Sequence, residues 1–153
     1  MKRIASLVVL LALSVESWAA SPWSGVWVLR DTTTPFRLTM ALEEVGSGWK
    51  ITYRIPVPDG QGGAAPSVMT VETGLDGKEV PSLVDGKPSG QTMDIRKIDD
   101  RHASTVVKID GKQTGVSKSE LSADGKVIKS ESEFTVSGPS GAAGKQVQYW
   151  DKQ

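Results

Sequence analysis

Residues 36–55 read FRLTMALEEVGSGWKITYRI. Apolar and polar side chains alternate from Phe36 to Glu43, and again from Trp49 to Ile55. This period of two residues is typical of β-strands with one buried face, whereas an amphipathic helix repeats every 3.6 residues. The segment 45–48 (VGSG) separates the two runs, and glycine adopts the positive φ angles that tight turns require. The stretch therefore predicts a β-hairpin.

Asp-Gly pairs recur along the rest of the chain, and all but the first are followed by lysine. Asp and Gly both tolerate positive φ, so the pair between alternating runs is among the strongest short-range hairpin signals. The pairs are Asp59-Gly60, Asp76-Gly77, Asp85-Gly86, Asp110-Gly111 and Asp124-Gly125. Their spacing predicts an antiparallel meander.

Further strands are expected at intervals of about 8–12 residues, which is the rhythm of β-sandwiches and β-barrels. They cover residues 25–31, 68–73, 79–84, 92–98, 104–109, 114–122, 127–136 and 145–150. The proline- and glycine-rich segment 56–66 is interpreted as the longest loop, and 137–144 as a second glycine-rich turn. No sustained helical stripe appears after residue 20.

The prediction is an all-β chain forming a single antiparallel up-and-down β-barrel of about 8–10 strands. An open sheet of this size would leave two edges as templates for aggregation, and pairing the first strand with the last removes both edges. Strand count and turn chemistry do not distinguish this arrangement from a two-sheet β-sandwich, which stays open as the alternative.

The N-terminus has the pattern of a secretory signal peptide, expected to be helical. Lys2 and Arg3 precede an apolar run from Ile4 to Leu13, and small residues stand at Ser17 and Ala19. The apolar run is about half the length of a membrane-spanning helix. We therefore expect residues 1–19 to be cleaved and residues 20–153 to form one domain, periplasmic or secreted, without stable membrane insertion.

Charge and cysteine content narrow the classes of partner. The chain holds 18 Lys plus Arg against 18 Asp plus Glu, with the signs interspersed. Nucleic acids and anionic membranes require a concentrated basic face, so neither is expected as a partner. The chain has no cysteine, so disulfides and a lipid-modified cysteine are excluded. We expect a monomer.

The residues offer little catalytic or metal-binding chemistry. His102 is the only histidine, and it follows Asp99 and Asp100 at an expected turn. Ser104 is nearby, but no Gly-x-Ser-x-Gly motif occurs. Each Asp-Gly-Lys turn offers a single carboxylate, whereas a calcium loop needs several converging oxygen ligands. We expect no metal, no cofactor and no enzymatic activity.

Two segments resemble a known group of barrels. Gly25-Val26-Trp27 begins the first expected strand, and the last ends in VQYWDK, residues 147–152. With the Asp-Gly-Lys turns, this layout is similar to the lipocalin and fatty-acid-binding-protein group, and more narrowly to small exported bacterial lipocalin-like proteins. The resemblance implies a barrel whose Trp27 plugs the closed end.

The chain departs from fatty-acid-binding proteins at two places. Their helical lid between the first two strands is replaced here by the short segment 32–35. Their last strand carries an arginine two residues before a tyrosine, which together hold a carboxylate, but here Val147 precedes Tyr149. The resemblance therefore implies an apolar or amphipathic ligand rather than a fatty acid.

The predicted ligand-binding residues combine aromatic and flexible apolar side chains, mostly from the first four strands. They are Trp27, Phe36, Leu38, Met40, Trp49, Tyr53, Met69 and Tyr149. Two functions follow as hypotheses. In the first, the protein binds a small hydrophobic or amphipathic molecule inside the barrel. In the second, side chains fill the interior and the loops 56–66 and 137–144 bind a protein partner.

Overall fold

The computed structural model describes residues 20–30, 37–58, 60, 64–137 and 142–153. The expected signal helix, 1–19, lies outside these residues. Within them the chain forms β-strands and no helix, so none is long and apolar enough to cross a membrane. The strands are β1 (Gly25–Leu29), β2 (Thr39–Val45), β3 (Gly48–Pro58), β4 (Ala64–Thr73), β5 (Asp76–Val84), β6 (Lys87–Lys97), β7 (His102–Ile109), β8 (Lys112–Leu121), β9 (Val127–Phe134) and β10 (Gly144–Lys152).

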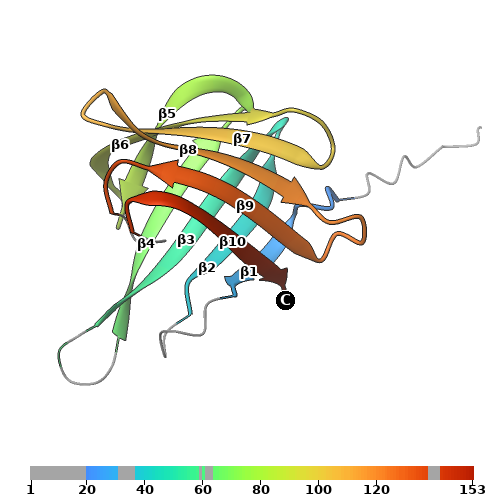
Figure 1. Cartoon of the computed structure of the whole chain (residues 1–153), viewed down its shortest axis with the longest axis horizontal. Coiled ribbons are helices and arrows are strands. Elements are labelled where there is room, and N and C mark those ends of the chain that lie inside the picture. The colour runs from blue at the N-terminus through green and yellow to red at the C-terminus, as the bar shows by residue number, and fades with distance from the viewer. Residues whose placement is uncertain (1–19, 31–36, 59, 61–63, 138–141) are drawn as a thin grey trace, which may run out of the picture.

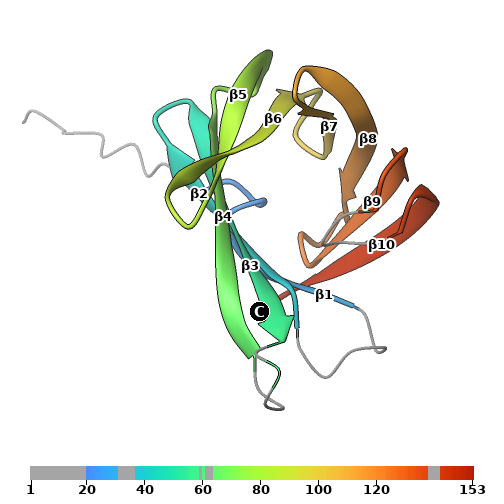
Figure 2. The same cartoon turned by 90° about the vertical axis from the view of Figure 1, so that its left-hand side faces the viewer.

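The ten strands close into one antiparallel barrel in which each strand pairs with its neighbours in sequence. The first strand pairs with the last, with Trp27 opposite Lys152 and Leu29 opposite Trp150. Figure 1 shows the ribbon from its side, and Figure 2 shows the strands arranged in a ring with β1 beside β10. The predicted up-and-down barrel is confirmed, and the β-sandwich alternative is excluded.

Two of the Asp-Gly pairs form the predicted two-residue hairpin turns. Asp85-Gly86 joins β5 to β6 with φ angles of 49° and 78°, and Asp110-Gly111 joins β7 to β8 with 49° and 76°. Positive φ at both central positions defines the turn whose twist matches that of the flanking strands. Asp124-Gly125 lies in the longer connection between β8 and β9, where Gly125 has a φ of 69°.

Asp76-Gly77 does not form the turn that its sequence predicts. The turn between β4 and β5 lies two residues earlier in the sequence, at Gly74-Leu75, where Leu75 has a φ of 60°. Asp76 and Gly77 lie inside β5, and the pairing of β5 with β6 is irregular between Asp76 and Glu79. Positive φ at Gly77, 79°, is therefore used for a β-bulge.

The expected loop 56–66 is mostly strand. β3 and β4 continue pairing through Pro56 opposite Pro66 to Pro58 opposite Ala64. The pairing of β2 with β3 starts at Arg54, and β5 pairs with β4 at residues 69–71. Residues 55–58 and 64–67, here called the hairpin arm, thus pair only with each other in these ladders. Prolines are tolerated at such strand edges because no ladder hydrogen bond is lost there. The arm extends beyond the barrel wall in both views (Figures 1 and 2).

Gly48 is required where the β2–β3 turn approaches the end of β4. A Cβ atom at position 48 would overlap the backbone carbonyl of Thr73, which cannot move without disturbing the ladder. Replacing Gly48 with alanine is expected to lower the free energy of unfolding by about 1–3 kcal/mol, the usual cost of overpacking. Chemical denaturation measures this change. The neighbouring exposed variant Ser47→Ala is the control, expected within about 0.5 kcal/mol of the unmodified protein; equal stability of the two variants would contradict the packing.

Candidate ligand-binding cavity

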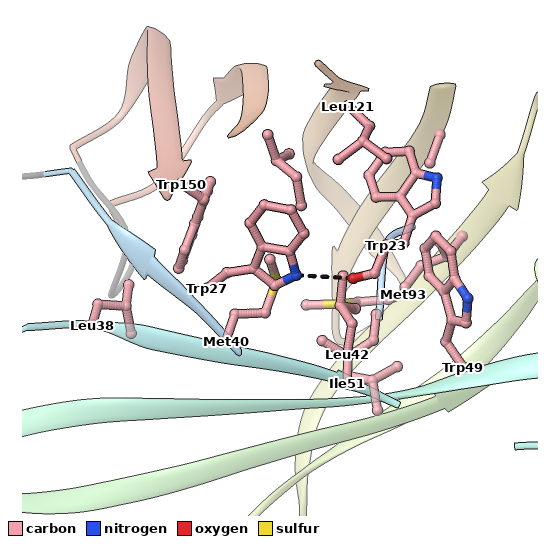
Figure 3. Packing of buried hydrophobic residues seen from close by; sticks show 14 residues of the cluster. Trp23, Trp27, Leu38, Met40, Leu42, Trp49, Ile51, Met93, Leu121 and Trp150 are labelled. Carbon is pink, nitrogen blue, oxygen red and sulfur yellow. Dashed lines mark hydrogen bonds between the residues drawn. The ribbon is translucent and has the colours of Figure 1, made fainter. Parts of the chain in front are cut away.

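One end of the barrel, here called the closed end, is plugged by tryptophans. The segment before β1 turns inward, with Ser24 N–H donating to the Ser21 carbonyl, and leaves Trp23 only 2% exposed. The Trp23 indole N–H donates to the carbonyl of Asp100 in the β6–β7 turn at 2.7 Å. Trp27 is fully buried and donates its indole N–H to the Trp23 carbonyl at 2.9 Å, the dashed bond in Figure 3. Both polar indole groups are therefore satisfied inside the plug.

Trp49 completes the plug from β3. Its ring centroid lies 5.3 Å from that of Trp23, with the planes tilted by 44°. Leu121, at the end of β8, is 1% exposed and belongs to the same cluster (Figure 3). Because consecutive connections of an up-and-down barrel alternate between its ends, the β2–β3, β4–β5, β6–β7 and β8–β9 turns share this end with the plug. The opposite ends of the strands lie at the far end.

A cavity lies between the plug and the far end. Its volume is about 280 Å³, close to the lower limit of about 300 Å³ for small-molecule sites. Its wall includes Trp23 and Trp49 at the plug, and Ile109 and Phe134 where β7 and β9 end at the far end. The barrel interior is therefore a hollow with space for a small molecule.

One side of the cavity is apolar. We call it the apolar wall, and it comes from β2, β3, β4 and β6, whose inward side chains are large and mostly buried. Its residues are Leu38, Met40, Leu42, Trp49, Ile51, Tyr53, Ile55, Met69, Met93 and Ile95. Leu38 immediately precedes β2. Three methionines among these residues supply side chains that adapt to the shape of a bound molecule.

The other side of the cavity combines small hydroxyl side chains with the apolar residues Ile128 and Phe134 of β9 and Trp150 of β10. We call Ser117, Ser119, Ser130 and Ser132 of β8 and β9 the serine wall. The ladder places Ser117 opposite Ser132 and Ser119 opposite Ser130. Within each pair the two Oγ atoms lie 2.9 Å apart and share a hydrogen bond. Two hydrogen-bonded serine pairs thus lie one above the other along the inner face.

Among the described lining residues none carries a charged side chain. The polar ones are the four serines together with Gln91, Thr105, Thr114, Ser137 and Gln148. The Gln91 amide donates to the Met69 sulfur at 3.6 Å, which is a weak acceptor. Desolvation within the barrel raises the pKa of Tyr53 to about 12, so its phenol is neutral at physiological pH. In the described part of its lining, the cavity therefore has hydroxyl and amide groups on one side and no charged side chain.

Burial of Tyr53 predicts a loss of stability at high pH. Below pH 10 its proton is bound in both the folded and the unfolded chain. Above pH 10 the unfolded chain releases the proton while the folded chain keeps it up to about pH 12, so the free energy of unfolding falls. From pH 10 to 11 this fall is expected to be about 1 kcal/mol larger in the unmodified protein than in Tyr53→Phe. Denaturant titrations at both pH values measure it; parallel losses in the two proteins would contradict the burial.

Five of the predicted ligand-binding residues come together on the cavity wall. They are Leu38, Met40, Trp49, Tyr53 and Met69. The structure places two others elsewhere. Trp27 is fully buried in the plug, and Tyr149 points outward at 39% exposure, with the Arg30 guanidinium 5.3 Å from its ring centre. Alternation along β10 turns Trp150 inward, so Tyr149 must face out. We therefore leave both out of the site. Phe36 lies outside the described residues.

Several lining residues were not predicted. Trp23 lies before the first alternating run, so periodicity gives no signal for its burial. The four serines alternate with charged residues in β8 and β9, a pattern that is also typical of solvated strands. The period of two could have predicted that these serines face inward. Ser117 and Ser119 share a strand face with buried Leu121, and Ser130 and Ser132 share one with buried Ile128.

The titratable cluster around His102 lies on the outer surface, away from the cavity. His102 Nδ1 is 2.8 Å from an Asp99 carboxylate oxygen, and both side chains are about half exposed. Hydrogen bonds from the Arg101 backbone N–H and from His102 lower the pKa of Asp99. Within the described ranges no group of His, Cys, Asp and Glu has the geometry to hold a metal ion. These contacts stabilise the β6–β7 turn, which also holds Trp23 through the Asp100 carbonyl.

Comparison of the chain with protein-family models, with curated proteins and with solved structures found no match.

Proposed function

We propose that residues 20–153 act as an exported, lipocalin-like binding protein that carries or sequesters a small hydrophobic or amphipathic molecule. The observation that carries this proposal is the cavity of about 280 Å³, whose described lining carries no charged side chain, inside a barrel plugged at one end. The plug closes one end of the barrel, so a bound molecule cannot leave through that end. The apolar wall provides the buried contact area that supplies most of the affinity in such sites. The signal-like pattern of residues 1–19 supports export.

Uptake of a neutral fluorescent probe tests this proposal. N-phenyl-1-naphthylamine is expected to bind once per chain, with increased emission and energy transfer from Trp49, which lines the cavity. Native mass spectrometry of protein purified from its own host is expected to show an additional small-molecule mass. Absence of both saturable probe uptake and a co-purified molecule would contradict the proposal. Addition of a competing apolar molecule is the control for binding outside the barrel.

The hairpin arm favours protein interaction as a second candidate function. Residues 55–58 and 64–67 pair with each other but with no further strand in the described ladders, so among the described residues both outer edges have backbone groups that no ladder uses. Such edges bind extended peptides by strand addition. Val57 is 47% exposed on this arm and provides an apolar contact.

Shortening the arm separates the two functions. In the variant, an Asn-Gly turn replaces residues 56–66 and joins Ile55 to Ser67, which lie opposite each other, so that Ile55 of the apolar wall is kept. If the arm is the interaction site, the variant loses a partner that the full chain retains in affinity purification, while probe uptake stays unchanged. Equal recovery of partners by both proteins would remove the arm from consideration.

A further inference from the structure

The serine wall and the apolar wall lie on opposite sides of the barrel. In the ring of ten strands, β8 is five strands away from β3 in either direction, and β9 is five strands away from β4. The serine wall belongs to β8 and β9, while Trp49, Tyr53 and Met69 belong to β3 and β4. A molecule that fills the cavity therefore contacts large apolar side chains on one side, and hydroxyl groups together with Ile128 and Phe134 on the other.

The serine wall retains hydrogen-bonding capacity after its internal bonds are made. Each hydroxyl has one donor and two acceptor positions, and each pair uses one donor for its internal bond. In the described part of the chain, Ser117 and Ser132 make no other side-chain hydrogen bond, and neither do Ser119 and Ser130. Because one residue lies between the two serines on each strand, the two pairs are about 7 Å apart.

One buried amide, that of Gln146, lies beside the serine wall, although Gln146 is not among the residues that line the cavity. Gln146 is opposite Ser132 in the ladder between β10 and β9, and its side-chain amide nitrogen is buried without a hydrogen-bond partner in the described structure. An unsatisfied buried donor costs about 1–3 kcal/mol and calls for an additional acceptor. By the alternation of β10, Gln146 shares the inward face with Gln148 and Trp150.

We infer that the cavity takes an uncharged amphipathic molecule, whose hydroxyl or carbonyl oxygens lie along the serine wall while its apolar body contacts the apolar wall. This inference rests on the proposed function and narrows its ligand class. A carboxylate or an ammonium group would be buried in a cavity whose described lining has no opposite charge, at a large desolvation cost. A purely apolar molecule would leave the serine hydroxyls without the hydrogen bonds that water makes to them.

Three probes with the same apolar chain test the charge preference: 1-decanol, decanoate and decylammonium. Binding is measured at pH 7 by isothermal titration and by quenching of tryptophan fluorescence. We expect 1-decanol to bind once per chain and at least 100-fold more tightly than either ion. Comparable affinity for decanoate or decylammonium would overturn the inference while leaving the proposed function intact. Propylbenzene, which has no polar group, is a fourth probe. Failure of 1-decanol, N-phenyl-1-naphthylamine and propylbenzene to bind would refute the proposed function itself.

Removing all four hydroxyls tests the role of the serine wall. The variant Ser117→Ala/Ser119→Ala/Ser130→Ala/Ser132→Ala removes both hydroxyls of each pair, so no hydroxyl is left without its hydrogen-bond partner. Its affinity for 1-decanol is expected to fall at least fivefold, while its affinity for propylbenzene is unchanged or higher. Ser104→Ala, on an outward position of β7, is the matched control. An unchanged ratio of the two affinities in a variant that remains folded by circular dichroism would overturn the assignment of the hydroxyls.

Discussion

Replacing Trp27 with alanine is expected to lower the free energy of unfolding by about 3–5 kcal/mol, the usual cost of removing a fully buried tryptophan. Trp27 has no exposed surface. Its indole N–H bond to Trp23 would be lost, and so would its contact with Lys152, whose ammonium lies 5.1 Å from the ring centre. Because Lys152 is opposite Trp27 in the ladder between β1 and β10, the variant weakens barrel closure as well as the plug.

Urea denaturation followed by circular dichroism measures this effect. Val26→Ala is the matched control, since Val26 is the preceding residue of β1 and is 47% exposed. Its change is expected to stay within about 0.5 kcal/mol. A loss of less than about 1 kcal/mol for Trp27→Ala, similar to that of the control, would mean that the indole is not the centre of a packed plug.

Filling the cavity is expected to abolish ligand binding without unfolding the protein. Thr105 lies on the cavity wall at the middle of β7. A tryptophan at this position occupies space that a ligand needs, so affinity for 1-decanol is expected to fall at least 100-fold. The free energy of unfolding is expected to change by about 1–3 kcal/mol at most, because the new side chain enters a hollow rather than a filled core. Titration calorimetry gives the affinity.

Ser104→Trp controls for the added side chain. Ser104 precedes Thr105 in β7 and faces the outside by the alternation of the strand. This variant is expected to bind 1-decanol like the unmodified protein. If Thr105→Trp retained full affinity, or if both variants lost it equally, the binding site would lie outside the barrel interior.

The alternation of residues 36–55 was sufficient to predict the β2–β3 hairpin, because one face of that stretch supplies apolar side chains to the interior. The Asp-Gly turns at residues 85–86 and 110–111 were predictable because their φ requirement is local. Strand number and closure then followed from the need to pair the sheet edges. Local rules failed at Asp76-Gly77, where the same φ preference was met by a bulge instead of a turn.

The parts that could not be predicted depend on contacts between distant residues. Trp23 is buried because its indole bonds to a carbonyl 77 residues away, which no periodic pattern encodes. The serine wall depends on the register of β8 and β9, which puts short hydroxyls opposite one another on the inner face. Extension of β3 and β4 into the proline-rich segment depends on those strands leaving the barrel, where proline costs no ladder hydrogen bond.

The methionine methyl groups allow the most direct measurement of the central claim. Met40, Met69 and Met93 all line the cavity, from three different strands. In protein labelled with ¹³C-methyl methionine, titration with 1-decanol is expected to shift all three methyl signals saturably at one equivalent. Nuclear Overhauser effects to the decyl chain are expected from the same methyl groups. Bound 1-decanol with all three signals unmoved would show that the molecule lies outside the barrel and would contradict the account.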